Sequence, residues 1–245
     1  MKNLFSQSSL KHLCLIIQGK NGQTDSERKG KRSERSQNSC IDSVSVLLQR
    51  LVELKAILLV FRHPNIISYK ESFMEDRTST LCIVMEHADG GDLLQKITLA
   101  RSGKQPKIPE QTCWSYFIQM LNGLQALHDR QIVHRDIKCA NLFLTKNGTL
   151  KLGDLNVSKV ARQGLLSTQT GTPYYASPEV WQDKPYDHKS DLWSVGCVAY
   201  EMCALQPPFR ANDMNQLYKR VTEGRIPPLP AMYSKDMMFC IKLCL

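Results

Sequence analysis

Apolar residues recur at helical spacing along much of the chain. The earliest such run, at 41–61, is apolar on most sides and stops where Pro64 cannot continue a helix. A later run, which Pro109 opens, has one apolar face. That face consists of Cys113, Phe117, Met120, Leu121, Leu124 and Leu127. Helices are predicted over 41–61, from Asp92, from Pro109, over 189–204 and over 212–222.

Strand-like runs are fewer than helical ones. The runs at 65–73 and 80–86 read as strands, and two strands alone make a marginal sheet. The apolar run SLKHLCLIIQ (9–18) can supply another strand, although nothing in its pattern decides this. Asn147 and Gly148 lie between two short apolar runs and predict a hairpin turn.

Composition and charge describe a globular chain with a basic tail. The 245 residues are 42% hydrophobic with a net charge of +9. Residues 1–40 hold eight Lys or Arg against three acids, and we expect this tail to be disordered. Its segment 19–39 has no aromatic residue among its charges, so a solvated tail is favoured over a nucleic-acid contact. The longest apolar run is far too short to span a membrane, which predicts a cytoplasmic protein with no membrane contact.

The segment VHRDIKCANLFLTKNGTLKLGDLN (133–156) gathers the groups that phosphoryl transfer needs. That reaction requires a base to orient the incoming hydroxyl, a cation near the transferred group and a metal on the phosphates. Asp136 can act as the base and Lys138 can meet the γ-phosphate. Asn141 and Asp154 offer hard oxygen ligands for Mg²⁺, and the hairpin between them returns the chain to the same place.

These residues carry a family resemblance. HRDIKCAN resembles the catalytic loop of protein kinases, DLN their metal-binding tripeptide and SPE their Ala-Pro-Glu motif. HPNIISYKESF, IVMEHADGGDL, TQTGTPYYASPEVW and PPF together resemble the NIMA-related serine/threonine kinases, over roughly residues 56–240. The resemblance implies an α+β, two-lobed fold with a mostly helical C-lobe. It also implies that the chain uses ATP and Mg²⁺ and acts on protein substrates, with an association with microtubules or cilia.

Further roles follow from the resemblance alone. Thr172 is expected to bond the base and the lysine, and Thr168 matches the phosphorylated activation site. Arg135 is expected to clamp that phosphate, since guanidinium pairs well with phosphate. Met85 corresponds to the residue behind the adenine, although a plain core methionine fits the sequence equally well. Backbone groups of Glu86 and His87 are expected at the adenine edge.

Four other positions are expected to be structural. His134 packs under the metal-binding tripeptide, and Asp191 anchors the catalytic loop from a core helix. Leu155 replaces the usual phenylalanine of the tripeptide and keeps that position apolar. Glu179 has its family partner, an arginine, beyond Leu245, so we expect it to lack that partner.

Two family features are absent from the printed sequence, a Gly-x-Gly-x-x-Gly hairpin and a strand lysine in a Val-Ala-Ile-Lys-like context. We therefore expect a partial N-lobe over 41–86 with an exposed surface for a regulatory partner, and a C-lobe over 87–245 that stops before its last helices. Two functions stay open: a serine/threonine kinase of NIMA-related type, weak or inactive in this form, or a catalytically dead kinase-like binding protein.

Overall fold

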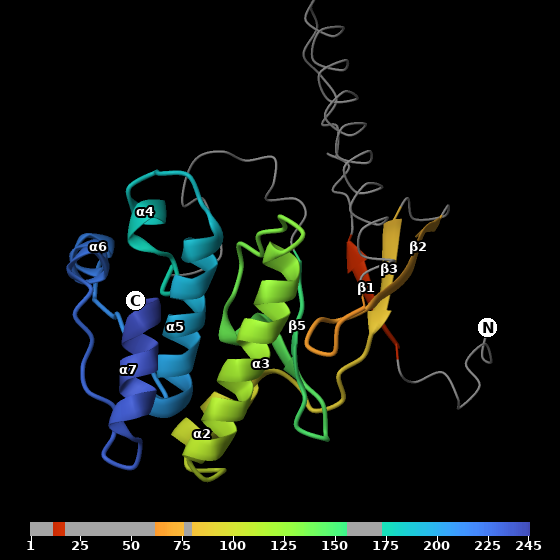
Figure 1. Ribbon diagram of the computed structural model, residues 1–245. Coiled ribbons are helices and arrows are strands. Elements are labelled where there is room, and N and C mark those ends of the chain that lie inside the picture. Colours follow the sequence, from red (N-terminus) through yellow and green to blue (C-terminus); the bar gives the residue numbers. More distant parts are fainter. Residues whose placement is uncertain (1–11, 18–61, 76–79, 156–172) are drawn as a thin grey trace, which may run out of the picture. The chain divides into compact units, whose positions relative to one another are not determined.

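A computed structural model describes residues 12–17, 62–75, 80–155 and 173–245 (Figure 1). The chain divides into two compact units, and each is described by itself. The described residues of the first unit are 12–17, 62, 67–75 and 80–87, and those of the second are 63–66, 88–155 and 173–245. The helix predicted over 41–61 and most of the basic tail lie outside the described residues. Among the described helices, none is both long and apolar enough to cross a bilayer.

The first unit holds an antiparallel sheet of three strands in the order β1-β3-β2. The two predicted strands are present as β2 (Tyr69–Glu75) and β3 (Thr80–Glu86). The apolar run near the N-terminus supplies β1 (His12–Ile17), which pairs with β3 from His12 opposite Glu86 to Ile17 opposite Leu81. A third strand gives the sheet the minimum size at which such sheets are usually stable.

The second unit is mostly helical, as predicted. Its long helices are α2 (Leu93–Arg101), α3 (Glu110–His128), α5 (His188–Ala204), α6 (Met214–Glu223) and α7 (Lys235–Cys244). Asp92 caps α2 by accepting a hydrogen bond from the Gln95 amide, and Pro109 precedes α3. Of the six residues predicted on the apolar face of α3, all but Leu121 are buried.

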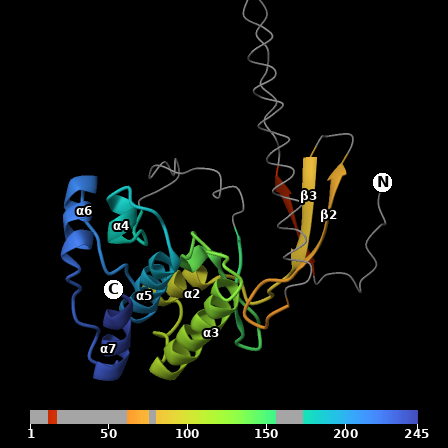
Figure 2. The same ribbon diagram turned by 45° about the horizontal axis from the view of Figure 1, so that its top comes forward.

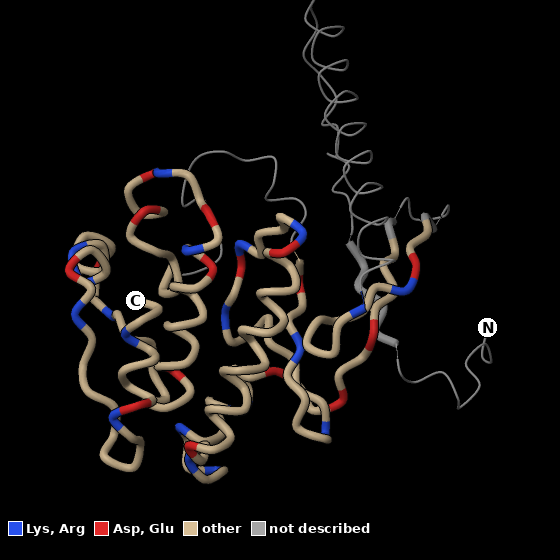
Figure 3. The backbone as a smooth tube through the Cα atoms, viewed as in Figure 1, with Lys and Arg blue, Asp and Glu red and all other residues tan. Residues whose placement is uncertain are grey.

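Helix α5 is the core of this unit and packs against α3 and α7 (Figure 1). Its middle, between Asp191 and Glu201, carries no Lys, Arg, Asp or Glu, which Figure 3 shows as an uninterrupted tan stretch. A Cβ on Gly196 would lie 2.7 Å from Cβ of Cys244, so α7 can approach α5 this closely only because position 196 is glycine.

Two helices were not predicted from the pattern. The short α4 (Pro178–Trp181) lies beside α6, with the rings of Trp181 and Tyr218 6.1 Å apart (Figure 2). The other is α7, whose N-cap Ser234 accepts from the Met237 amide at 3.1 Å and donates to Glu110 of α3. Contacts between helices therefore support α7, and such contacts are not visible in local periodicity.

The HPN turn belongs to the second unit, which explains why β2 starts later than predicted. Ile66 forms a parallel bridge with Leu152, and the Leu152 amide donates to the Asn65 carbonyl at 2.8 Å. The Asn65 side chain donates to Gln119 Oε1 at 3.0 Å and to the Leu150 carbonyl at 2.9 Å. A Cβ on Gly123 would lie 2.8 Å from the Asn65 carbonyl oxygen, so the turn rests directly on the backbone of α3.

Replacing Asn65 with alanine is expected to destabilise the protein by about 1–3 kcal/mol, because the buried Leu150 carbonyl loses this donor and Gln119 Oε1 keeps only the Leu150 amide. The free energy of unfolding from urea titration measures this change. Asn122→Ala, on the exposed face of α3, is the matched control and should change stability by less than about 0.5 kcal/mol. Equal effects of the two substitutions would contradict the role assigned to the Asn65 side chain.

Candidate active site

The predicted hairpin is present, and its end lies beside Asn141. Strands β4 (Leu142–Leu144) and β5 (Leu150–Leu152) pair antiparallel, and Gly148 in the turn has φ 80°. Just beyond β5, the Gly153 amide donates to the Asn141 carbonyl at 2.9 Å. This bond fixes the backbone next to Asp154 against the backbone of Asn141.

Three predicted site residues bond one another through their side chains. Asn141 Nδ2 donates to the Asp136 carbonyl at 2.8 Å and to Asp136 Oδ2 at 3.1 Å. Lys138 Nζ lies 3.0 Å from the same Oδ2. The Asp136 side chain is 16% exposed and that of Lys138 is 38% exposed, so both reach the surface. The Asp136 carboxylate and the Lys138 ammonium group thus lie in contact where solvent can reach them.

The arrangement offers oxygen atoms suited to Mg²⁺. Both hydrogen bonds of the Asn141 amide use Nδ2, which leaves Oδ1 as the side-chain atom that can bind a cation. Asp154, two residues after the end of β5, is exposed. It adopts φ 51°, a left-handed conformation that aspartate tolerates better than most residues. An amide oxygen and a carboxylate are the hard donors that Mg²⁺ prefers, so these residue types fit the metal.

The loop 134–141, which the motifs predict to be the catalytic loop, is held by the buried carboxylate of Asp191 in α5. Asp191 Oδ2 accepts a hydrogen bond from the His134 amide at 2.9 Å and lies 2.8 Å from His128 Nε2. Its other oxygen, Oδ1, accepts from the Arg135 amide at 2.9 Å and from the Tyr186 hydroxyl at 2.6 Å. Burial alone raises the pKa of Asp191, but these four hydrogen bonds outweigh it and hold that pKa below its ordinary value.

The two backbone amides explain how the loop keeps an unfavourable shape. Arg135 has φ 66°, which costs a non-glycine residue of order 1 kcal/mol or more and persists only where the surroundings fix it. His134 is 2% exposed. Burial lowers the pKa of its imidazole, against the opposing pull of Asp191, Asp136 and Asp154, which agrees with a packing role and a neutral ring.

Glu179 has a partner that the sequence did not reveal. The Ser190 hydroxyl donates to Glu179 Oε1 at 2.5 Å. The carboxylate therefore has a hydrogen-bond donor, and the expectation that it lacks its family arginine stays a prediction. Ser190 lies in the first turn of α5 and belongs to the capping box with Asp187, which holds the hydroxyl toward α4.

A second buried carboxylate was missed by sequence reasoning. Glu201 is 2% exposed and accepts from the Tyr175 hydroxyl at 2.6 Å and the Cys139 thiol at 3.5 Å, and it pairs with Arg101 at 3.4 Å. It links the catalytic loop to the segment before α4. One signal was available, since Glu201 is a lone charge in an otherwise apolar helical run.

The residues expected at the adenine edge belong to the first unit. Met85 is partly buried in β3, and His87, just after β3, is exposed. The Glu86 amide donates to the Ser68 carbonyl at 2.8 Å, and Glu86 Oε2 accepts from the Ser68 amide at 3.1 Å. The Glu86 amide therefore already has a partner within its own unit. Leu155 is partly buried, and Thr168 and Thr172 lie outside the described residues.

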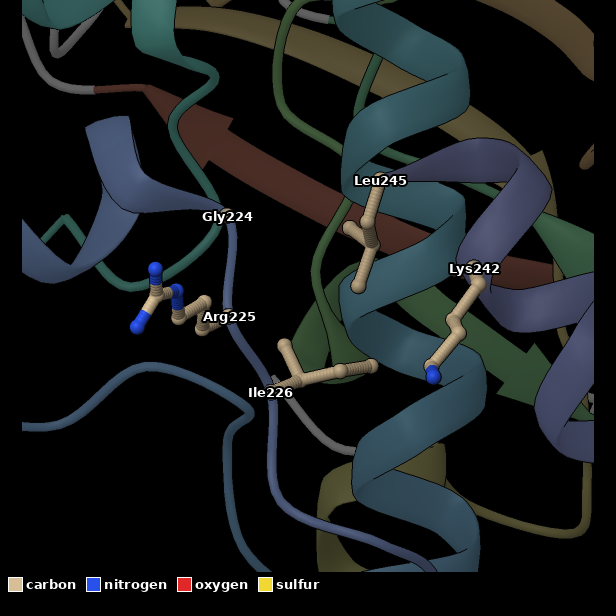
Figure 4. A pocket seen from close by; sticks show the side chains of 5 residues that line it. All are labelled: Gly224, Arg225, Ile226, Lys242 and Leu245. Carbon is tan, nitrogen blue, oxygen red and sulfur yellow. The ribbon is translucent and has the colours of Figure 1, made fainter.

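A separate pocket of about 510 Å³ lies where α6 ends and α7 closes the second unit (Figure 4). Its lining consists of Gly224, Arg225, Ile226, Lys242 and Leu245. None of these is a predicted site residue, so this pocket is distinct from the cluster of Asp136, Lys138 and Asn141.

Comparison with known proteins agrees with the geometry. Residues 16–239 match the protein kinase domain, and the chain therefore belongs to the protein kinase family. Within it, the chain is similar to NIMA-related kinases. It is 44% identical over 191 residues to the serine/threonine-protein kinase Nek3 of Mus musculus, an alignment that covers 77% of this chain and 36% of that protein.

Two other relatives give the same result. Identity is 42% over 200 residues with Nek4 of Mus musculus, covering 80% of this chain and 25% of that protein. It is 41% over 199 residues with the probable serine/threonine-protein kinase nek2 of Dictyostelium discoideum, covering 80% of this chain and 47% of that protein. The chain thus spans half or less of the length of these curated relatives. The α+β fold expected from the motifs is that of the protein kinase domain.

Proposed function

We propose that this chain transfers the γ-phosphate of ATP to serine or threonine hydroxyls of protein substrates, with Mg²⁺ as cofactor. The observation that carries the proposal is the shared contact of Lys138 and Asn141 with one oxygen of Asp136, beside the backbone of Asp154. ATP and Mg²⁺ are general to the family, and the relatives named above are serine/threonine kinases.

Each side chain has a separate task in this proposal. Asp136 accepts the proton of the substrate hydroxyl, and Lys138 balances charge on the transferred group. Asn141 Oδ1 and the Asp154 carboxylate hold Mg²⁺, which neutralises the phosphate oxygens when bound. Thr172 supports the base, Arg135 receives a phosphate on Thr168, and Met85, Glu86 and His87 meet the adenine.

A second candidate is a kinase-like binding protein without catalysis. The printed sequence favours it at one point, because it contains no glycine-rich hairpin and no strand lysine of the usual context. Each lost phosphate contact can cost a few kcal/mol of transition-state stabilisation, so transfer can fall by orders of magnitude while the folded site persists.

Incubating the purified protein with ATP and a serine/threonine substrate protein tests both candidates. We expect phosphate on serine or threonine that depends on Mg²⁺, and a rise in melting temperature with Mg²⁺ and ATP together. Asp154→Asn should abolish the Mg²⁺-dependent part of that rise, while Asp183→Asn, on an exposed turn, should preserve it. No transfer and no thermal shift in the parent protein would leave the binding role.

A further inference from the structure

Tyr186 lies in the segment between α4 and α5, and its hydroxyl donates a hydrogen bond to Asp191, the residue that holds the loop 134–141. Its oxygen lies 2.6 Å from Asp191 Oδ1, the same oxygen that accepts from the Arg135 amide. Burial and the adjacent Asp191 raise the pKa of the Tyr186 hydroxyl, so it stays protonated and acts as the donor. We propose that Tyr186 is a positioning residue, which sets the catalytic loop by fixing the orientation of the Asp191 carboxylate.

The position of Tyr186 is itself well determined. The next residue, Asp187, is the N-cap of α5, and it accepts from the amides of Lys189 at 2.8 Å and Ser190 at 3.2 Å. The Ser190 hydroxyl also binds Glu179 of α4. The backbone that carries Tyr186 is therefore tied to both helices, and its phenol approaches Asp191 from a fixed direction.

Water cannot replace the phenol at this carboxylate. The Asp191 side chain has 0% exposure, and both of its oxygens are used twice. Without the Tyr186 hydroxyl, Oδ1 keeps only the Arg135 amide, and the carboxylate is free to rotate out of line with the amides of both His134 and Arg135. The Arg135 amide then loses its aligned acceptor, and with it part of what holds φ at 66°.

The inference rests on the proposed function only for its catalytic consequence. A loop that samples other conformations places Asp136 correctly for a smaller fraction of the time, which lowers kcat. Tyr186 does not touch the groups assigned to nucleotide, so KM for ATP should not change. The local consequence, a less protected pair of amides at His134 and Arg135, holds whether or not the protein transfers phosphate.

Tyr186→Phe tests the proposal, with Tyr233→Phe as the matched control. The Tyr233 hydroxyl is also buried and donates to the Ile108 carbonyl at 2.8 Å, away from the catalytic loop. Amide hydrogen exchange followed by NMR should become about tenfold faster at His134 and Arg135 in Tyr186→Phe, and remain unchanged in the cores of α3 and α5. In the phosphate-transfer assay, kcat should fall severalfold with KM for ATP constant.

Three results would overturn the proposal: unchanged exchange at both amides, an equal acceleration throughout α3 and α5, or the same pattern in Tyr233→Phe. Failure of the proposed function looks different. In that case neither the parent protein nor the variants transfer phosphate, and the exchange rates at His134 and Arg135 still decide the role of Tyr186.

Discussion

Asp136→Asn is expected to lower phosphate transfer by about 100- to 10 000-fold while the protein stays folded, because an amide cannot accept the hydroxyl proton. In the parent protein, Lys138 and Asn141 both contact Asp136 Oδ2. The substitution keeps the size of the side chain and one oxygen atom that can accept from these two residues. Melting temperature should therefore change little. The measurement is the initial rate of phosphate incorporation into serine and threonine at saturating Mg²⁺ and ATP.

Asp129→Asn provides the control for this substitution. Asp129 lies at the end of α3, is exposed, and is not one of the proposed site residues. We expect its rate to match that of the parent protein. A rate in Asp136→Asn equal to that of the control would remove Asp136 as the base, whatever the overall activity.

Asp191→Asn is expected to have the largest effect on stability, about 3–5 kcal/mol of unfolding free energy. The carboxylate accepts four hydrogen bonds, and an amide nitrogen at either position would face two donors. The volume is unchanged, so the loss arises from hydrogen bonding and charge. Urea unfolding at neutral pH measures it, and a loss below about 1 kcal/mol would contradict the assigned role.

The same carboxylate predicts a pH dependence. In the folded protein the pKa of Asp191 lies below its ordinary value of 3.8, because the four donors favour the charged form over the opposing effect of burial. Its contribution to stability is therefore complete above that value and is lost as pH falls through the lowered folded-state pKa. Over this acid range, Asp191→Asn should show a shallower loss of stability than the parent protein.

The sequence predicted that the side chains of Asp136, Lys138 and Asn141 lie together, because this depends on short-range spacing. Asp136 and Asn141 are five residues apart on one loop, and the Asn147-Gly148 turn returns the chain to Asp154 through a hairpin. The burial of α3 likewise followed from helical periodicity. These features need few long-range contacts to form.

Features that depend on distant contacts were missed or wrongly assigned. The Ser190 partner of Glu179, the buried Glu201 with Tyr175 and Cys139, and the helix α7 all arise where helices pack together. The start of β2 was placed too early because Ile66 pairs with Leu152 instead. The spacing of apolar residues within one segment does not show which distant segment it contacts, because different partners are compatible with the same spacing.

A crystal structure of the protein with Mg²⁺ and a non-hydrolysable ATP analogue tests the proposed site most directly. We predict one Mg²⁺ bound by both the Asp154 carboxylate and Asn141 Oδ1, with the terminal phosphate near Lys138 and Asp136. Nucleotide bound elsewhere, or Mg²⁺ held by neither Asn141 nor Asp154 at saturating concentrations, would contradict the claim that these side chains form a single phosphoryl-transfer site.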